Sequence, residues 1–277
     1  MTTDRLKIWL LAPLILLAFA GNSLLARAAL ADPANSPGAY AAIRLIAGAA
    51  LLIGLGLAGR FSVVPRRRDM ATVVALFVYA LGFALAYVSM GAASGALILF
   101  AAVQATIVGV GLLRGDRITP IQATGLAIAL AGVGWLLFPG LTAPRPLPAL
   151  LMAAAGVAWG IYSTVNSGED SPTARSARNF CGAAMLGLAA LLVLPFHLTP
   201  TGWVLATVSG AVTSALGYVL WYVFLPHVQR LVAASLQLSV PAITAVGAAL
   251  LLGEAIGLRL IIASILIIAG ISLTLRR

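Results

Sequence analysis

Aromatic residues at helical spacing are the first candidates for chemistry. Tyr79, Phe83 and Tyr87 recur every four residues and so share one face of a helix, and Tyr218 and Tyr222 repeat this spacing. Such rings can hold an apolar side chain or, by cation–π attraction, an ammonium group. The alternative is that they pack between helices or form an interfacial belt. The residues that we expect to line a cavity are Tyr79, Phe83, Trp159, Tyr162 and Tyr218.

Amide side chains inside apolar runs are the second candidates. A polar group is costly in hydrocarbon unless it faces a partner or water. Gln237 lies four residues before Pro241, which should bend its helix and free a backbone carbonyl. Asn22 lies deep in the first apolar run. We expect both amides to form part of the hydrogen-bonding wall of the cavity, the alternative being that they join helices to one another.

Two arginines lie inside apolar runs, Arg44 and Arg178, each six or seven residues from the start of its run. One hypothesis is that each attracts a substrate carboxylate at a gate, one on either side of the membrane. The alternative is that both side chains extend to the interface, which a depth of about 10 Å permits.

Catalytic and metal-binding groups are scarce. A single cysteine, Cys181, and two distant histidines, His197 and His227, give no metal site, and no pairing typical of an intramembrane protease occurs. We therefore expect no catalytic residue, no metal and no cofactor. The acids fall in termini, loops or the ends of apolar runs, which predicts transport without a carboxylate proton relay. They are Asp4, Asp32, Asp69, Asp116, Glu169, Asp170 and Glu254.

The elements that position these residues must be membrane helices. The chain has 277 residues, of which 62% are hydrophobic and 9% charged, and its mean hydropathy is +1.08. A soluble domain carries about 25% charged residues. The net charge is +10, and the charged residues lie in short clusters between apolar runs. This distribution argues against nucleic-acid binding. The lipid bilayer is the expected partner.

Ten apolar runs are long enough to be helical spans, and we expect an all-α integral membrane protein. The first, from Ile8 to Ala26, exceeds the 7–15 residues of a signal-peptide core, so we interpret it as a retained helix. An N-terminus in the cytoplasm would place 12 of the 17 basic residues on that side, so both termini are expected there. The expected spans are 8–30, 37–59, 70–90, 93–113, 119–137, 147–167, 173–194, 200–224, 230–252 and 258–275.

The two halves of the chain match each other. The offsets between matching segments, 134, 135 and 138, rise in order, as a duplication with small loop insertions would give. Five spans in each half oblige the second copy to enter the membrane from the opposite face. Two inverted five-helix repeats, 1–140 and 141–277, are therefore expected, an architecture typical of alternating-access transporters. The matching segments are 44–52 with 178–186, 81–88 with 216–223, and 106–118 with 244–256.

At these segments the sequence resembles the drug/metabolite transporter superfamily, in its ten-helix branch with two EamA-type repeats. The resemblance rests on the aromatic segments 81–88 and 216–223, the helix ends 112–116 and 250–254, and the Trp-bearing segment 159–162, of which 19–22 is a poorer copy. A span-4 proline of that family is absent, since Val103 stands opposite Pro241. Within the superfamily the chain looks most like the YddG-type bacterial exporters of aromatic and other amino acids.

The resemblance implies a multi-pass protein of the bacterial inner membrane that exports small amphipathic metabolites, with amino acids as the expected substrates and no enzymatic activity. Drugs or other metabolites are the rival substrates. A channel is the rival of another class, although the polar residues are scattered and do not form a continuous stripe. We expect the chain to function as a monomer.

Overall fold

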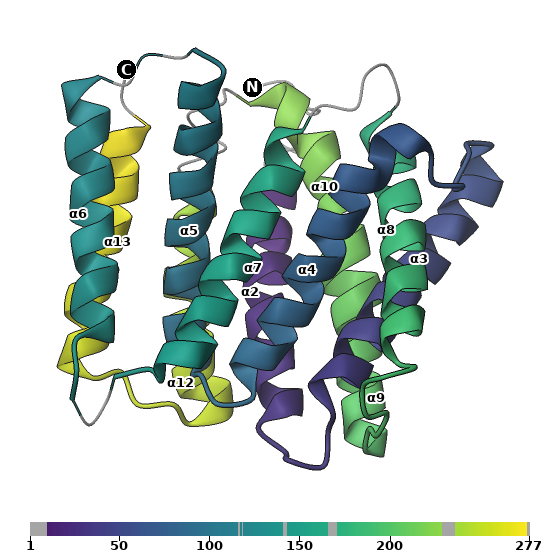
Figure 1. Ribbon diagram of the computed structural model, residues 1–277, viewed down its shortest axis with the longest axis horizontal. Helices are drawn as coiled ribbons and strands as arrows, with labels where there is room; N and C mark the ends of the chain where they lie inside the picture. The colour runs from purple at the N-terminus through teal and green to yellow at the C-terminus, as the bar shows by residue number, and fades with distance from the viewer. Residues whose placement is uncertain are drawn as a thin grey trace.

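The computed structural model describes residues 10–115, 117, 119–140, 143–165, 171–228 and 236–275. These residues form a bundle of helices that run up and down beside one another, without a strand (Figure 1). The all-helical prediction is confirmed. In chain order the bundle contains α2 (Leu11–Leu30), α3 (Pro37–Gly59), α4 (Met70–Tyr87), α5 (Ala92–Leu113), α6 (Pro120–Leu137), α7 (Pro146–Thr164), α8 (Pro172–Ala190), α9 (Pro200–Val208), α10 (Gly217–Phe224), α12 (Ser239–Leu252) and α13 (Leu258–Thr274).

Two of these helices belong to one rod. Between α9 and α10 lies a π-helix, η2 (Ser209–Leu216), so that Pro200–Phe224 is continuous. Counted this way, the described residues form ten rods, one at each expected span. Seven of the ten are long and apolar enough to cross a membrane. Of the others, α12 and α13 are shorter apolar helices, and α8 contains polar residues that lower its hydropathy.

Proline and hydroxyl residues define where many helices begin. Proline is the first residue of α3, α6, α7, α8 and α9, where its fixed φ suits a helix and its missing N–H is not needed. Thr119, Ser171 and Thr199 cap α6, α8 and α9 by accepting a backbone N–H. Proline, in three cases together with a hydroxyl cap, therefore marks the start of these five rods.

The position of Pro241 within its helix differs from the prediction. We expected a span over 230–252 with Pro241 bending its middle. The structure begins α12 at Ser239, which places Pro241 in the first turn, where a proline breaks no helical hydrogen bond. Part of the expected span, 229–235, lies outside the described residues.

The rods pack in a regular pattern. Helix α7 packs against α4 and α5, and α2 packs against the α9–η2–α10 rod and α12. Helix α3 packs against η2, and α8 packs against α4. The α6 and α13 helices form a pair at one edge of the bundle (Figure 1). This arrangement places the middles of α2, α4, α7 and α10 around the centre.

The contact between α3 and η2 depends on a glycine, and Gly210→Ala is expected to destabilise the fold. A Cβ at Gly210 would overlap the backbone carbonyl oxygen of Arg44, which cannot turn away as a side chain can. Overpacking of this kind costs about 1–3 kcal/mol. The measurement is the thermal unfolding midpoint in detergent. Gly54→Ala is the control, because nothing lies within 4 Å of its added Cβ; equal midpoints in the two variants would contradict the prediction.

Candidate functional site

A small cavity of about 30 Å³ lies in the centre of the bundle, and aromatic rings form much of its wall. It is lined from α2, α4, α5, α7 and α10, and by Gln237, which precedes α12. The structure brings six of the seven predicted cavity residues to it. These are Asn22, Tyr79, Phe83, Trp159, Tyr218 and Gln237.

The rings contact one another around Trp159. Its centroid lies 5.0 Å from that of Tyr79 and 4.8 Å from that of Tyr218, which joins α7 to α4 and α10. The seventh predicted residue, Tyr162, is buried behind this layer and stacks on Trp159 at 5.1 Å. Rings at these separations support one another at fixed positions. The cavity therefore has a rigid, largely apolar wall.

The polar side of the cavity is built around Asn22. Its Oδ1 accepts hydrogen bonds from the hydroxyls of Ser209 (3.2 Å), Thr213 (2.7 Å) and Ser214 (2.9 Å), all from the π-helix η2. Its Nδ2 donates to the Thr213 backbone oxygen at 3.1 Å. A π-helix has wider turns than an α-helix and occurs frequently at functional sites. Asn22 is thus both a cavity residue and the join between α2 and η2.

Arg44 lies directly behind this wall and is 2% exposed. Its Nε donates to Ser214 Oγ at 3.1 Å, and its Nη2 donates to Tyr79 Oη at 3.0 Å. The guanidinium carbon lies 5.1 Å from the ring centroid of Tyr79 and 4.9 Å from that of Phe83. Arg44 therefore touches two lining residues, and Ser214 connects it to a third, Asn22.

Arg178 has a different environment although it matches Arg44 in the repeat. Its Nε lies 2.7 Å from Asp69 Oδ2, and the two side chains are 1% and 0% exposed. Asp69 precedes α4, and its Oδ2 also accepts the Arg66 backbone N–H at 3.0 Å. Beside this pair, Thr72 Oγ1 lies 2.9 Å from Asn179 Oδ1. Neither arginine extends to the surface, so the interfacial alternative is wrong for both. Their role as gates stays a prediction.

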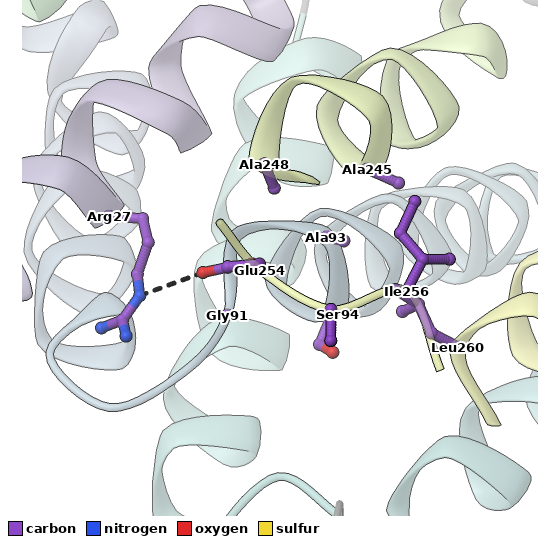
Figure 2. Close-up of a pocket in the computed structure, with 10 residues that line it drawn as sticks. Arg27, Gly91, Ala93, Ser94, Ala245, Ala248, Glu254, Ile256 and Leu260 are labelled. Atoms are coloured by element: carbon purple, nitrogen blue, oxygen red, sulfur yellow. Dashed lines mark hydrogen bonds and ion pairs between the residues drawn. The ribbon is translucent and has the colours of Figure 1, made fainter. Parts of the chain in front are cut away.

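A second ion pair holds together the lower end of the bundle in Figure 1. Arg27 Nε donates to Glu254 Oε1 at 3.2 Å, and Figure 2 shows this pair at the edge of a pocket of about 280 Å³. Arg27 Nη1 also donates to the backbone oxygens of Tyr87 and Val88. Glu254 accepts the backbone N–H of Ala92, the first residue of α5. We call this set of contacts, which ties α2, the α4–α5 turn and the residues after α12, the Arg27–Glu254 clasp.

Comparison with known proteins gives the family. Residues 146–276 match the model of the EamA-like transporter family. The chain is also 46% identical over 270 residues to "Uncharacterized protein PA1977" of Pseudomonas aeruginosa, with 96% of this chain and 93% of that protein covered. The chain belongs to the EamA-like transporter family. Members of this family are multi-pass membrane transporters, and this membership suggests that the chain carries small metabolites.

A solved structure agrees with the fold of this EamA-like protein. The match, described as "Crystal structure of protein", has a TM-score of 0.68 at 21% identity and covers 97% of both chains. At that identity the likeness shows the fold alone.

Several functional candidates of this EamA-like chain were missed by sequence reasoning. Ser209 and Thr213 were not among the candidates because no pattern in the sequence predicts a π-helix. Asp69 was grouped with acids outside the spans, yet it is fully buried. The clasp joins Arg27 to a residue 227 positions away. Of these residues, only Asp69 could have been suspected from the sequence, because two arginines inside apolar runs require acidic or hydrogen-bonding partners.

Proposed function

We propose that the chain exports small amphipathic metabolites by alternating access, with aromatic and other neutral amino acids as its substrates. The observation that carries the proposal is the central cavity, whose aromatic wall faces the amides of Asn22 and Gln237. Rings suit an apolar side chain or an ammonium group, and amides suit the polar groups of an amino acid. Tyr79, Phe83, Trp159 and Tyr218 are the proposed substrate contacts, with Tyr162 supporting Trp159.

Two inverted repeats, 1–140 and 141–277, are the proposed basis of the transport cycle. Exchange of the two halves relates the packing contacts: α7 packs on α4 and α5 as α2 packs on the α9–η2–α10 rod and α12. Helix α2 begins, and α13 ends, at the upper end of the bundle in Figure 1. The distribution of basic residues favours the cytoplasm for this end. We place the protein in the bacterial inner membrane, acting as a monomer.

Multidrug or other metabolite export is the second candidate within transport, and the same aromatic wall would suit it. A channel is the candidate of another class. Against a channel stands the position of Trp159, whose ring contacts three other rings in the centre of the bundle, where a pore would have to pass.

Counterflow in proteoliposomes tests the proposal. Vesicles loaded with unlabelled phenylalanine should transiently accumulate labelled phenylalanine above equilibrium, and other neutral amino acids should compete. Competition by cationic drugs alone would favour multidrug export. Flux that equilibrates without any overshoot would indicate a channel. Protein-free vesicles are the control.

The proposed cycle uses no membrane carboxylate relay. The acids that the structure describes are Asp32, exposed in the α2–α3 loop, and Asp69 and Glu254, each bound to an arginine. A pH gradient alone should therefore drive no sustained uphill uptake in the same vesicles. Persistent accumulation under that gradient would contradict this part of the proposal.

We propose that the Arg27–Glu254 clasp holds closed the end of the bundle opposite the cytoplasmic one. Glu254→Gln is therefore expected to speed the opening of this end. The side chains of the pair are 25% and 22% exposed, and such pairs contribute about 0.2–1 kcal/mol, so a rate increase of about 1.4-fold to fivefold is expected. The measurement is labelling of Ser94→Cys, at the pocket in Figure 2, by an impermeant maleimide in a Cys181→Ala background.

Arg145→Gln provides the control for this experiment. Arg145 is exposed at the start of α7, at the same end of the bundle, and its replacement also removes one charge. Its labelling rate should equal that of the parent chain. If Glu254→Gln labels no faster than Arg145→Gln, the clasp does not hold this end closed.

A further inference from the structure

Arg44 and Arg178 occupy matching positions in the sequence, but they differ in whether an acid neutralises the guanidinium group. Both guanidinium groups are buried, and Arg178 is neutralised by Asp69 at 2.7 Å. Among the residues that the structure describes, Arg44 contacts only neutral groups, namely the hydroxyls of Ser214 and Tyr79 and the rings of Tyr79 and Phe83. The other acids that the structure describes lie elsewhere, Glu254 on Arg27 and Asp32 exposed in a loop.

The guanidinium of Arg44 also has an unused donor. Its Nη1 is buried and has no hydrogen-bond partner within the described part of the chain. A buried charge is costly unless it is paired, and the aromatic faces and hydroxyls around Arg44 offset only part of that cost. An arginine with a free nitrogen is a strong donor to a carboxylate. The surroundings of Arg44 are therefore incomplete without an anion.

The cavity is the side from which an anion can approach. Tyr79 and Phe83 line the cavity and contact the guanidinium, and Asn22 lines it and shares Ser214 with Arg44. A carboxylate that enters beside Tyr79 and Phe83 would lie next to the two side chains that contact the guanidinium. The apolar part of the same ligand would then lie against Trp159 and Tyr218.

We propose that Arg44 binds the carboxylate of the substrate and makes the cavity selective for carboxylate-bearing amphiphiles. The inference rests on the proposed function and names the chemical group by which the substrate is recognised. It also excludes a class of ligand: a cationic amphiphile without a carboxylate would bring a second positive charge to an unpaired guanidinium. Amines and cationic drugs are therefore poor ligands, whereas amino acids and aromatic carboxylates are good ones.

Four matched ligands test the inference on the natural chain. Phenylalanine and 3-phenylpropionate carry a carboxylate, whereas phenylalaninamide and phenethylamine do not. The purified protein in detergent should show a higher unfolding midpoint with the first two ligands only, because a ligand that binds the folded state stabilises it. Amide and amine stabilisation equal to that by phenylalanine would overturn the inference and leave the proposed function standing. Stabilisation by none of the four would overturn both.

Variants locate the effect at Arg44. Arg44→Gln should weaken phenylalanine binding at least about tenfold, or about 1.4 kcal/mol, and remove the preference over the amide. Arg44→Lys should keep the preference, since it keeps the charge. Arg175→Gln is the control: it also removes an arginine that lies over a ring, that of Tyr222, but not at the cavity. A folded Arg44→Gln that still prefers phenylalanine to its amide would overturn the assignment. The ligand comparison on the natural chain stands even where Arg44→Gln does not fold.

Discussion

Asp69→Asn is expected to destabilise the bundle by about 3–5 kcal/mol, because it removes the charge of one partner from a buried ion pair. Arg178 lies 2.7 Å from Asp69, and neither side chain is in contact with solvent. An asparagine keeps the shape but loses the charge, and its NH₂ group donates where Arg178 also donates. The pair joins the start of α4 to α8, so its loss should separate those two helices first.

The measurement is the free energy of unfolding in a graded denaturant, in mixed micelles. Asp32→Asn is the control, because Asp32 is exposed in the α2–α3 loop and its replacement changes the net charge equally. A double variant, Asp69→Leu with Arg178→Met, should recover most of the lost stability, since apolar groups of similar volume often replace a buried ion pair without loss. Equal stability of Asp69→Asn and Asp32→Asn would show that the pair contributes nothing.

The helices could be predicted because the bilayer imposes their length and composition. Each rod lies at a span read from the sequence, and proline or hydroxyl caps give several of the start positions. The expected span 230–252 is tested only from residue 236, and there the structure has α12, with Pro241 in its first turn and not in its middle.

The aromatic part of the site could also be predicted, for a geometric reason. The spacing of Tyr79 and Phe83 places both rings on one helix face, and this relation holds whatever the neighbouring helices do. The structure has both rings at the cavity, with centroids 5.4 Å apart. Which further rings would meet them, such as Phe19 and Phe100, depends on tertiary packing and could not be read from local spacing.

The groups that pair with the two buried arginines could not be predicted, because these pairs form between segments that are distant in the sequence. The repeat suggested one role for Arg44 and Arg178. The structure gives the two arginines different partners. Asp69 pairs with Arg178, whereas Val204 occupies the position that matches Asp69 at the offset of 135. Within the described residues, Arg178 therefore has an acidic partner, whereas Arg44 has neutral ones.

Trp159→Ala is expected to weaken the binding and counterflow of phenylalanine by about tenfold to a hundredfold. The indole ring contacts Tyr79, Tyr162 and Tyr218, with centroids 4.8–5.1 Å away. An aromatic pair contributes about 0.5–1.5 kcal/mol, and a substrate ring would lose both that contact and the support that Trp159 gives its neighbours. Trp159→Phe, which keeps a ring at the position, should retain most of the activity.

A tryptophan outside the cavity separates this effect from a general loss of packing. Trp203 on α9 is 41% exposed and contacts Phe196, so Trp203→Ala removes the same volume far from the cavity. If Trp159→Ala and Trp203→Ala reduce counterflow equally, the loss reports the stability of the bundle and not the substrate wall. A loss confined to Trp159→Ala, with similar unfolding midpoints, assigns the indole to the substrate. The two outcomes differ because, within the described residues, Trp159 contacts the lining rings of both α4 and α10, whereas Trp203 contacts Phe196.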